Sequence, residues 1–161
     1  MEKLEFHGVV PFGKIHDEEL EYSVVAARHQ GQWVCVRLQG RNDWCFPGGT
    51  REEGESIEEN ACRELFEETG AIDYQLVPLG AYGVNHRNPE NHALIRQSWG
   101  GFFAAEIQQF QELPKEFEIA ERRLFPEFPL ASTRFPFIMP GMMQWLHAHK
   151  SLWDDFDLVV E

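Results

Sequence analysis

One segment of the chain carries the start signal, the stop signal and the apolar face of a single helix, and it restricts the fold more than any other. Ser56 followed three residues later by Glu59 forms a capping box, in which each side chain binds the backbone N–H of the other residue. Gly70 suits the left-handed conformation that often follows the last helical residue. We therefore expect a helix over residues 57–69 whose apolar stripe packs against another layer of the protein. That stripe consists of Ile57, Ala61 and Leu65.

The segments on either side of this helix favour an α/β fold. Apolar runs bounded by turn residues predict strands over residues 21–28, 32–38, 74–84, 94–107 and 118–125. A second helix is expected over residues 140–150, with Pro140 in its first turn. Strands before, between and after two helices indicate a mixed sheet with helices packed against its faces. Residues 1–161 are expected to form one domain, because this length is ordinary for a single core.

Composition excludes several classes of protein. Apolar residues make up 43% of the chain and charged residues 25%, which is ordinary for a globular protein, so extensive disorder is not expected. No apolar run is long enough to span a bilayer and the N-terminal segment lacks the apolar core of a signal peptide, so no membrane partner is expected. Three cysteines without CxxC spacing argue against a disulfide framework and indicate a cytoplasmic location. The net charge of −13 repels polyanions and disfavours a stable complex with nucleic acid.

Acidic residues are concentrated in and just before the first helix: eight of the seventeen residues from Glu52 to Glu68 are glutamates. Residues three and four apart are neighbours on a helix, so Glu64 lies beside Glu67 and Glu68. These carboxylates are expected to point away from the apolar stripe, toward the loop at residues 47–49. Clustered carboxylates on a rigid element are typical ligands of hard cations such as Mg²⁺, which often join them to substrate phosphates. A solvated acidic helix face is the alternative that composition alone supports.

The fixed positions of this region form one continuous pattern. It runs Gly49, five residues, Glu55, seven residues, Arg63-Glu64-Leu65, one residue, Glu67-Glu68, one residue and Gly70. A pattern of this length is far more specific than a short motif. It resembles the Nudix box, the signature of the Nudix hydrolases. The one departure is Ala71, where the family usually carries a bulkier aliphatic residue, and Ile72 can supply the missing bulk.

Weaker similarity to the family extends in both directions from the box. Residues 44–49 look like the strand and loop that lead into it, and residues 118–121 and 124–126 are similar to a late loop and strand of the family. The resemblance implies an α/β/α sandwich around a mixed β-sheet. The helix of the box would pack on one side of this sheet and the C-terminal helix on the other.

Carried over position by position, the resemblance implies a binding site for Mg²⁺ or Mn²⁺. The implied ligands are the carboxylates of Glu64, Glu67 and Glu68, the backbone carbonyl of Gly48 and, more weakly or through water, Glu55. Arg63 would hold Glu67 in place without binding the metal. The general base that takes a proton from water would be Glu67 or Glu64 in the first instance and Glu118 in the second. Glu118 could equally be a further metal ligand or a plain surface residue.

Other residues are weaker candidates. Arg37, on an expected strand, could bind substrate phosphate, although a surface role is the more common one. His86 and His92 bracket a polar run that we expect to be an irregular loop over the mouth of the active site. A zinc site at these histidines is the alternative, but no compact set of ligands accompanies them. The acidic tail over residues 152–161 yields no structural prediction.

The resemblance also implies a reaction. Nudix enzymes hydrolyse a nucleoside diphosphate linked to another group, so water attack on a pyrophosphate bond of a small-molecule nucleotide is expected. Residues that would indicate ADP-ribose, dinucleoside polyphosphate or coenzyme A substrates are not found, which leaves MutT-like house-cleaning of nucleoside triphosphates. An RNA 5′-pyrophosphohydrolase is the runner-up, followed by a non-catalytic nucleotide-sensing module, although such modules usually lose box glutamates that this chain retains. Assembly as a homodimer is left open.

Overall fold

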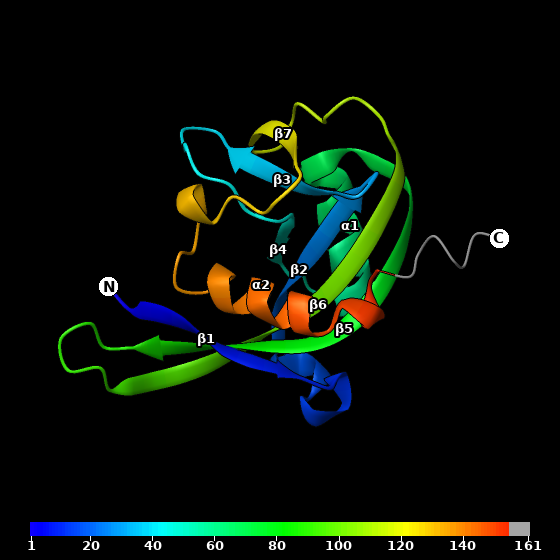
Figure 1. The fold of residues 1–161 in the computed structure, drawn as a ribbon. Coiled ribbons are helices and arrows are strands. Elements are labelled where there is room, and N and C mark those ends of the chain that lie inside the picture. Colours follow the sequence, from blue (N-terminus) through cyan, green and yellow to red (C-terminus); the bar gives the residue numbers. More distant parts are fainter. Residues whose placement is uncertain (155–161) are drawn as a thin grey trace.

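The computed structural model describes residues 1–154 and contains one seven-stranded sheet with helices on both of its faces (Figure 1). The strands are β1 (Lys3–Val10), β2 (Leu20–His29), β3 (Gln32–Leu38), β4 (Gly48–Thr50), β5 (Ala71–Arg87), β6 (Leu94–Phe110) and β7 (Ile119–Phe125). The α-helices are α1 (Ile57–Thr69) and α2 (Met139–Ala148), and short 3₁₀ turns lie at Phe12–Lys14, Asp17–Glu19, Leu130–Ser132 and Lys150–Leu152. No helix within these residues is long and apolar enough to cross a bilayer.

The sheet is mixed, as the sequence predicts. Its strand order is β1-β5-β6-β2-β3-β7, with β4 paired to β2. β2 and β6 run parallel, and every other paired set of strands is antiparallel. β2 and β3 pair at only two positions next to their turn and then diverge. β4 pairs with β2 where β3 has moved away, at Tyr22, Ser23 and Val24, so the loop before α1 lies against the middle of the sheet.

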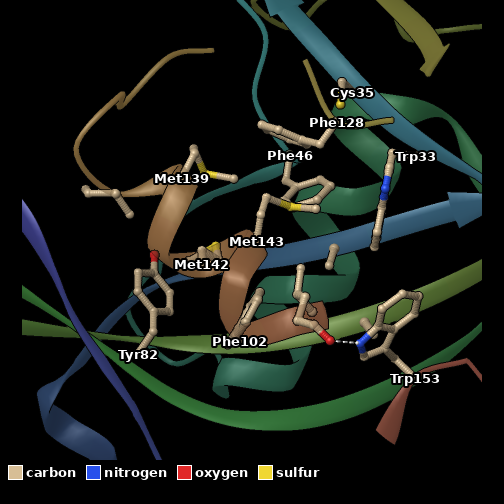
Figure 2. Close-up of a cluster of buried hydrophobic side chains, with 14 of the residues drawn as sticks. Trp33, Cys35, Phe46, Tyr82, Phe102, Phe128, Met139, Met142, Met143 and Trp153 are labelled. Atoms are coloured by element: carbon tan, nitrogen blue, oxygen red, sulfur yellow. Dashed lines mark hydrogen bonds between the residues drawn. The ribbon is translucent and has the colours of Figure 1, made fainter. Parts of the chain in front are cut away.

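Each face of the sheet buries its own apolar core, which confirms the predicted α/β/α sandwich. On one face the fully buried side chains of Ala61 and Leu65 from α1 pack against Val25 and Phe103. On the other face the methionines of α2 pack among aromatic rings from the sheet and its loops (Figure 2). Trp153, after α2, closes this second core, and its indole N–H donates a 2.8 Å hydrogen bond to the carbonyl of Leu146.

The predicted elements are present, and the differences lie where tertiary pairing outweighs local signals. α1 and β3 match the predicted bounds, and α2 lies within two residues of them. β5 and β6 extend beyond the predicted ranges because they pair with each other from Ala71↔Phe110 to Arg87↔Leu94. β1 was not predicted. It forms by pairing with β5 across a bulge between Phe6 and Gly8, and this long-range contact leaves no clear local signal.

The polar run over residues 85–92 is not a loop throughout, so that expectation was wrong for its first part. Asn85, His86 and Arg87 end β5, and only the turn that follows is irregular. The flanking strands supply the polar partners that solvent would otherwise provide: Asn85 donates to Glu5 of β1 at 3.1 Å. Residues 155–161 of the acidic tail, including Asp155 and Asp157, lie outside the described residues.

Candidate active site

Helix α1 begins and ends as its sequence predicts. The Ser56 hydroxyl accepts a hydrogen bond from the Glu59 backbone N–H at 3.0 Å, and the Glu59 carboxylate accepts one from the Ser56 N–H at 2.9 Å. Gly70 adopts a left-handed conformation with φ +77° and closes the helix by bonding to the Phe66 carbonyl. With both ends fixed and its apolar stripe buried, α1 is a rigid support for the carboxylates on its opposite face.

The loop that leads into β4 lies directly against these carboxylates. The Gly48 N–H donates a 2.8 Å hydrogen bond to Oε1 of Glu68. A β-carbon on Gly48 would lie 2.3 Å from the Ser23 carbonyl oxygen, and one on Gly49 would lie 2.4 Å from the carboxyl carbon of Glu64. Two glycines are therefore needed here for close approach, because any side chain would displace either β2 or the carboxylate.

Arg63 joins the acidic residues into one network. Its Nε and Nη2 donate to the two oxygens of Glu55, at 2.6 and 3.1 Å. Its Nη1 donates to Glu64 at 3.1 Å and to both oxygens of Glu67 at 3.2 and 3.1 Å. Two nitrogens of the planar guanidinium thus donate in parallel to the two oxygens of Glu55, and the third nitrogen donates to Glu67. The contact between Arg63 and Glu67 is the one that the resemblance implies, and the fork onto Glu55 was not anticipated.

The carboxylates of this network differ sharply in acidity. Burial raises the pKa of Glu68 to about 8, with repulsion from Glu64 and Glu67 acting in the same direction and the Gly48 N–H opposing it. Burial also raises the pKa of Glu64 to about 7, against the attraction of Arg63. The hydrogen bonds from Arg63 lower the pKa of Glu55 to about 2. Two buried carboxyl groups therefore hold protons near neutral pH when no cation faces them.

These residues fit a hard divalent cation. All the candidate ligands are oxygens, as Mg²⁺ and Mn²⁺ prefer. Glu68 has no ion-pair partner among the described residues, and Glu64 shares the single guanidinium of Arg63 with Glu55 and Glu67. Among residues 1–154, no group of three or more His, Cys, Asp or Glu side chains forms a ready-made metal site. The carboxylates of Glu64 and Glu67 are directed at Arg63 instead. The Ser23 hydroxyl, buried beside this loop, has no hydrogen-bond partner in the described part of the chain, so the site also has an unused polar group.

A cavity of about 540 Å³ opens beside the carboxylates. Glu64 and Glu68 line it together with Gly48, and Glu118 reaches it from the segment before β7. Its other walls are largely apolar and include Phe46, Tyr82, Ile138, Met139 and Met142. Arg37 does not line it. That side chain donates instead to Glu121 at 3.3 Å and to a backbone carbonyl in the following turn.

The wall of the cavity also contains a chain of polar contacts that the sequence did not indicate. His86 contacts Glu2 through Nδ1 at 3.0 Å and Ser98 through Nε2 at 2.7 Å, and the Ser98 hydroxyl contacts that of Tyr22 at 2.6 Å. These residues come from three strands and the N-terminal segment, so only the fold brings them together. His92 lies in the exposed turn after β5, and it is not part of this chain of contacts.

Comparisons with known proteins agree with this geometry. A family model described as the NUDIX domain matches residues 9–146. A curated relative, the putative 8-oxo-dGTP diphosphatase YtkD of Bacillus subtilis strain 168, is 33% identical over 118 residues, which cover 71% of this chain and 70% of that protein. The RNA pyrophosphohydrolase of Haemophilus ducreyi is 36% identical over 69 residues, which cover 42% of this chain and 35% of that protein.

A solved structure supports the same assignment. The Bacillus subtilis pyrophosphohydrolase BsRppH superposes with a TM-score of 0.61 at 26% identity, covering 80% of this chain and 74% of that one. The similarity therefore extends over most of the length of both chains. Together with the box geometry, these matches establish that the chain belongs to the Nudix hydrolase family and is a pyrophosphohydrolase.

Proposed function

We propose that this chain hydrolyses a pyrophosphate bond of a nucleoside triphosphate, that the reaction requires Mg²⁺ or Mn²⁺, and that it serves to remove unwanted nucleotides. The observation that carries the proposal is the position of Glu64 and Glu68 at the wall of a cavity of about 540 Å³. That volume lies within the range of small-molecule sites, and apolar walls with a few polar groups suit a nucleotide base. The 33% identical relative carries the name of a nucleoside triphosphate diphosphatase.

The metal would be held by the carboxylates of Glu64, Glu67 and Glu68 and the carbonyl of Gly48, with Glu55 as a weaker or indirect ligand. When bound, a divalent cation neutralises charge on phosphate oxygens and makes a nearby water more acidic. The chain's own contribution is to hold these oxygens in place on the rigid helix α1. Arg63 holds the carboxylates of Glu55, Glu64 and Glu67, and the Gly48 N–H holds that of Glu68. Arg63 acts as a positioning residue.

Glu67 is the proposed general base. Arg63 donates to both of its oxygens, which limits rotation of the carboxylate. Water attacks a phosphorus atom while its proton passes to Glu67, and the bridging P–O bond breaks with its electron pair on the leaving phosphate oxygen. Glu64 is an equally favoured candidate for the general base. Glu118, which lines the cavity from a separate segment, is the second choice for this role.

Removal of pyrophosphate from the 5′ end of RNA is the second candidate function. It is favoured by the Haemophilus ducreyi relative, whose name is RNA pyrophosphohydrolase. The net charge of −13 opposes it, because an RNA body bound outside the cavity would be repelled. We therefore propose a small nucleotide as the partner rather than a stable nucleic-acid complex. We also propose a cytoplasmic location, which the three unpaired cysteines support.

A product-release assay tests these functions directly. The protein is incubated with Mg²⁺ and a panel of canonical and oxidised nucleoside triphosphates, and in parallel with a short 5′-triphosphorylated RNA, and the products are identified by mass. Metal-dependent release of pyrophosphate or phosphate from a free nucleotide supports the first proposal. Faster turnover of the RNA than of every nucleotide supports the second. Binding of nucleotides without any turnover supports the sensing module instead.

A further inference from the structure

Arg134 is held at the edge of the cavity by a rigid backbone. It lies between the 3₁₀ turn at Leu130–Ser132 and α2, and it lines the same cavity as Glu64 and Glu68. Its N–H donates to the Trp44 carbonyl at 2.8 Å. The preceding residue, Thr133, is 7% exposed and donates through its hydroxyl to the same carbonyl at 3.1 Å. The base of the Arg134 side chain is therefore fixed.

The guanidinium of Arg134 is also supported from one side. Its central carbon lies 4.7 Å from the centre of the Phe135 ring. Phe135 has a φ of +61°, a left-handed conformation that is costly for an aromatic residue. Its carbonyl accepts hydrogen bonds from the N–H groups of Ile138, the N-cap of α2, and Met139, the first residue of that helix. Backbone strain of this kind persists only where the surroundings impose it, and it is concentrated at binding sites.

The hydrogen-bonding capacity of Arg134 is unused. Within residues 1–154 its guanidinium makes no hydrogen bond and no ion pair. Each of the other arginines pairs with a carboxylate or donates to a backbone carbonyl: Arg28, Arg37, Arg41, Arg51, Arg63, Arg87, Arg96, Arg122 and Arg123. Asp43 feels the charge of Arg134 only through space, and both of its oxygens already accept from Arg41. A guanidinium offers five N–H donors in a fixed fork that matches phosphate oxygens.

Arg134 shares its cavity with the proposed metal site. Glu64 and Glu68 line the same cavity, and within residues 1–154 no ion pair joins either carboxylate to Arg134. An anionic ligand placed between them would be bound by Arg134 directly and by the carboxylates only through a cation.

We propose that Arg134 binds non-bridging oxygens of the substrate's phosphate chain, with Phe135 holding its guanidinium in the binding position. This inference rests on the proposed function in that it places a polyphosphate in the cavity. It assigns to Arg134 the phosphate-binding role that the sequence suggested for Arg37. Because phosphate oxygens are common to all candidate substrates, Arg134 contributes affinity whatever the base.

The test compares Arg134→Gln with Arg123→Gln. Arg123 also lies over an aromatic ring, 4.8 Å from the centre of Trp44, and it is paired with Glu121 outside the cavity. Both variants lose one positive charge, so the comparison separates a local contact from a change in overall charge. Steady-state kinetics on a nucleoside triphosphate and calorimetric binding of inorganic tripolyphosphate, both with Mg²⁺, give two independent readouts.

For Arg134→Gln we expect KM and the tripolyphosphate Kd to rise about 10- to 100-fold, the range for losing a hydrogen bond between charged groups, with a smaller fall in kcat. Arg123→Gln should stay close to wild type. If Arg134→Gln does not fold, as judged by its melting temperature, Arg134→Lys takes its place and should raise both constants to a smaller extent, because it keeps the charge and loses the fork.

Two outcomes separate this inference from the proposed function. If wild type hydrolyses no nucleotide but binds tripolyphosphate through Arg134, the function is wrong and the anion site stands. If wild type binds no tripolyphosphate, or if wild type and the Arg134 variant bind it equally, the anion site is wrong even in an active enzyme.

Discussion

A β-carbon on Gly49 would lie 2.4 Å from the carboxyl carbon of Glu64, so any larger residue at this position of β4 must displace the carboxylate. Gly49 has no left-handed backbone conformation to maintain, which leaves contact with Glu64 as the reason for its lack of a side chain. The loop and α1 are thus fitted to each other through the carboxylate that is expected to bind metal.

Gly49→Ala should therefore impair catalysis more than stability. The methyl group must push the Glu64 carboxylate away from its place, and a displacement of about 1 Å in an active site can lower the rate about 100-fold. We expect kcat to fall about 10- to 100-fold while the melting temperature changes by less than about 4 °C, equivalent to roughly 1 kcal/mol for a domain of this size. Gly13→Ala is the matched control, since a β-carbon there meets nothing within 4 Å. Wild-type kcat in Gly49→Ala would contradict a role for the Glu64 position.

The stability of the metal-free protein should fall as pH rises through the neutral range. The folded-state pKa values of Glu64 and Glu68 are about 7 and about 8, above the ordinary value of 4.5. Between pH 4.5 and these raised pKa values the folded protein binds more protons than the unfolded chain. The free energy of unfolding therefore decreases as pH rises. The pKa of Glu55 is shifted the other way, to about 2, so its contribution is lost only as pH falls below 4.5.

Melting temperatures in EDTA at pH 5.5 and pH 8.5 measure this effect. Excess Mg²⁺ should raise the melting temperature at pH 8.5, because a bound cation favours the ionised carboxylates. The double variant Glu64→Gln with Glu68→Gln removes only these two of the 27 acidic residues, and it should lose most of both responses. A protein whose melting temperature at pH 8.5 is indifferent to Mg²⁺ does not bind the metal at this cluster.

Local signals were sufficient for the part of the site that lies on one helix. Ser56, Glu59 and Gly70 specify the ends of α1, and helical periodicity places Glu64 beside Glu68. Nothing local could place Arg134 at the cavity, because an isolated polar residue carries no periodic signal. The run that begins near His86 was expected over the mouth of the site, and His86 does line the cavity. Its place in β5 and its contact with Ser98 depend on strand pairing, which the local sequence does not show. Arg37 was named as a phosphate ligand for the same reason: its strand could be predicted, but its pairing with Glu121 of β7 could not.

Replacement of Arg63 tests the geometry of the network rather than its charge. Arg63→Lys keeps the cation but cannot donate in parallel to both oxygens of Glu55 while also holding Glu67. We expect kcat to fall about tenfold or more, in line with losses at residues that orient metal ligands. Arg41→Lys is the control, since Arg41 forms a similar two-pronged contact with Asp43 far from the cavity. If both changes lower kcat equally little, Arg63 serves only to balance the charge of the glutamates and does not orient them.

The two candidates for the general base occupy distinct positions, which allows them to be told apart. Glu67 lies within the network on α1, 3.1 Å from Nη1 of Arg63, whereas Glu118 is an exposed residue that reaches the cavity from the segment before β7. If Glu67 takes the proton, Glu67→Gln should lower kcat by at least about 10³-fold, and Glu118→Gln by less than about tenfold. The pH dependence of kcat adds a second criterion, because the base must be ionised: its acidic limb should disappear in the variant that lacks the base and persist in the other. If kcat falls further in Glu118→Gln than in Glu67→Gln, and the acidic limb disappears in Glu118→Gln, then Glu118 is the general base and Glu67 is a metal ligand alone.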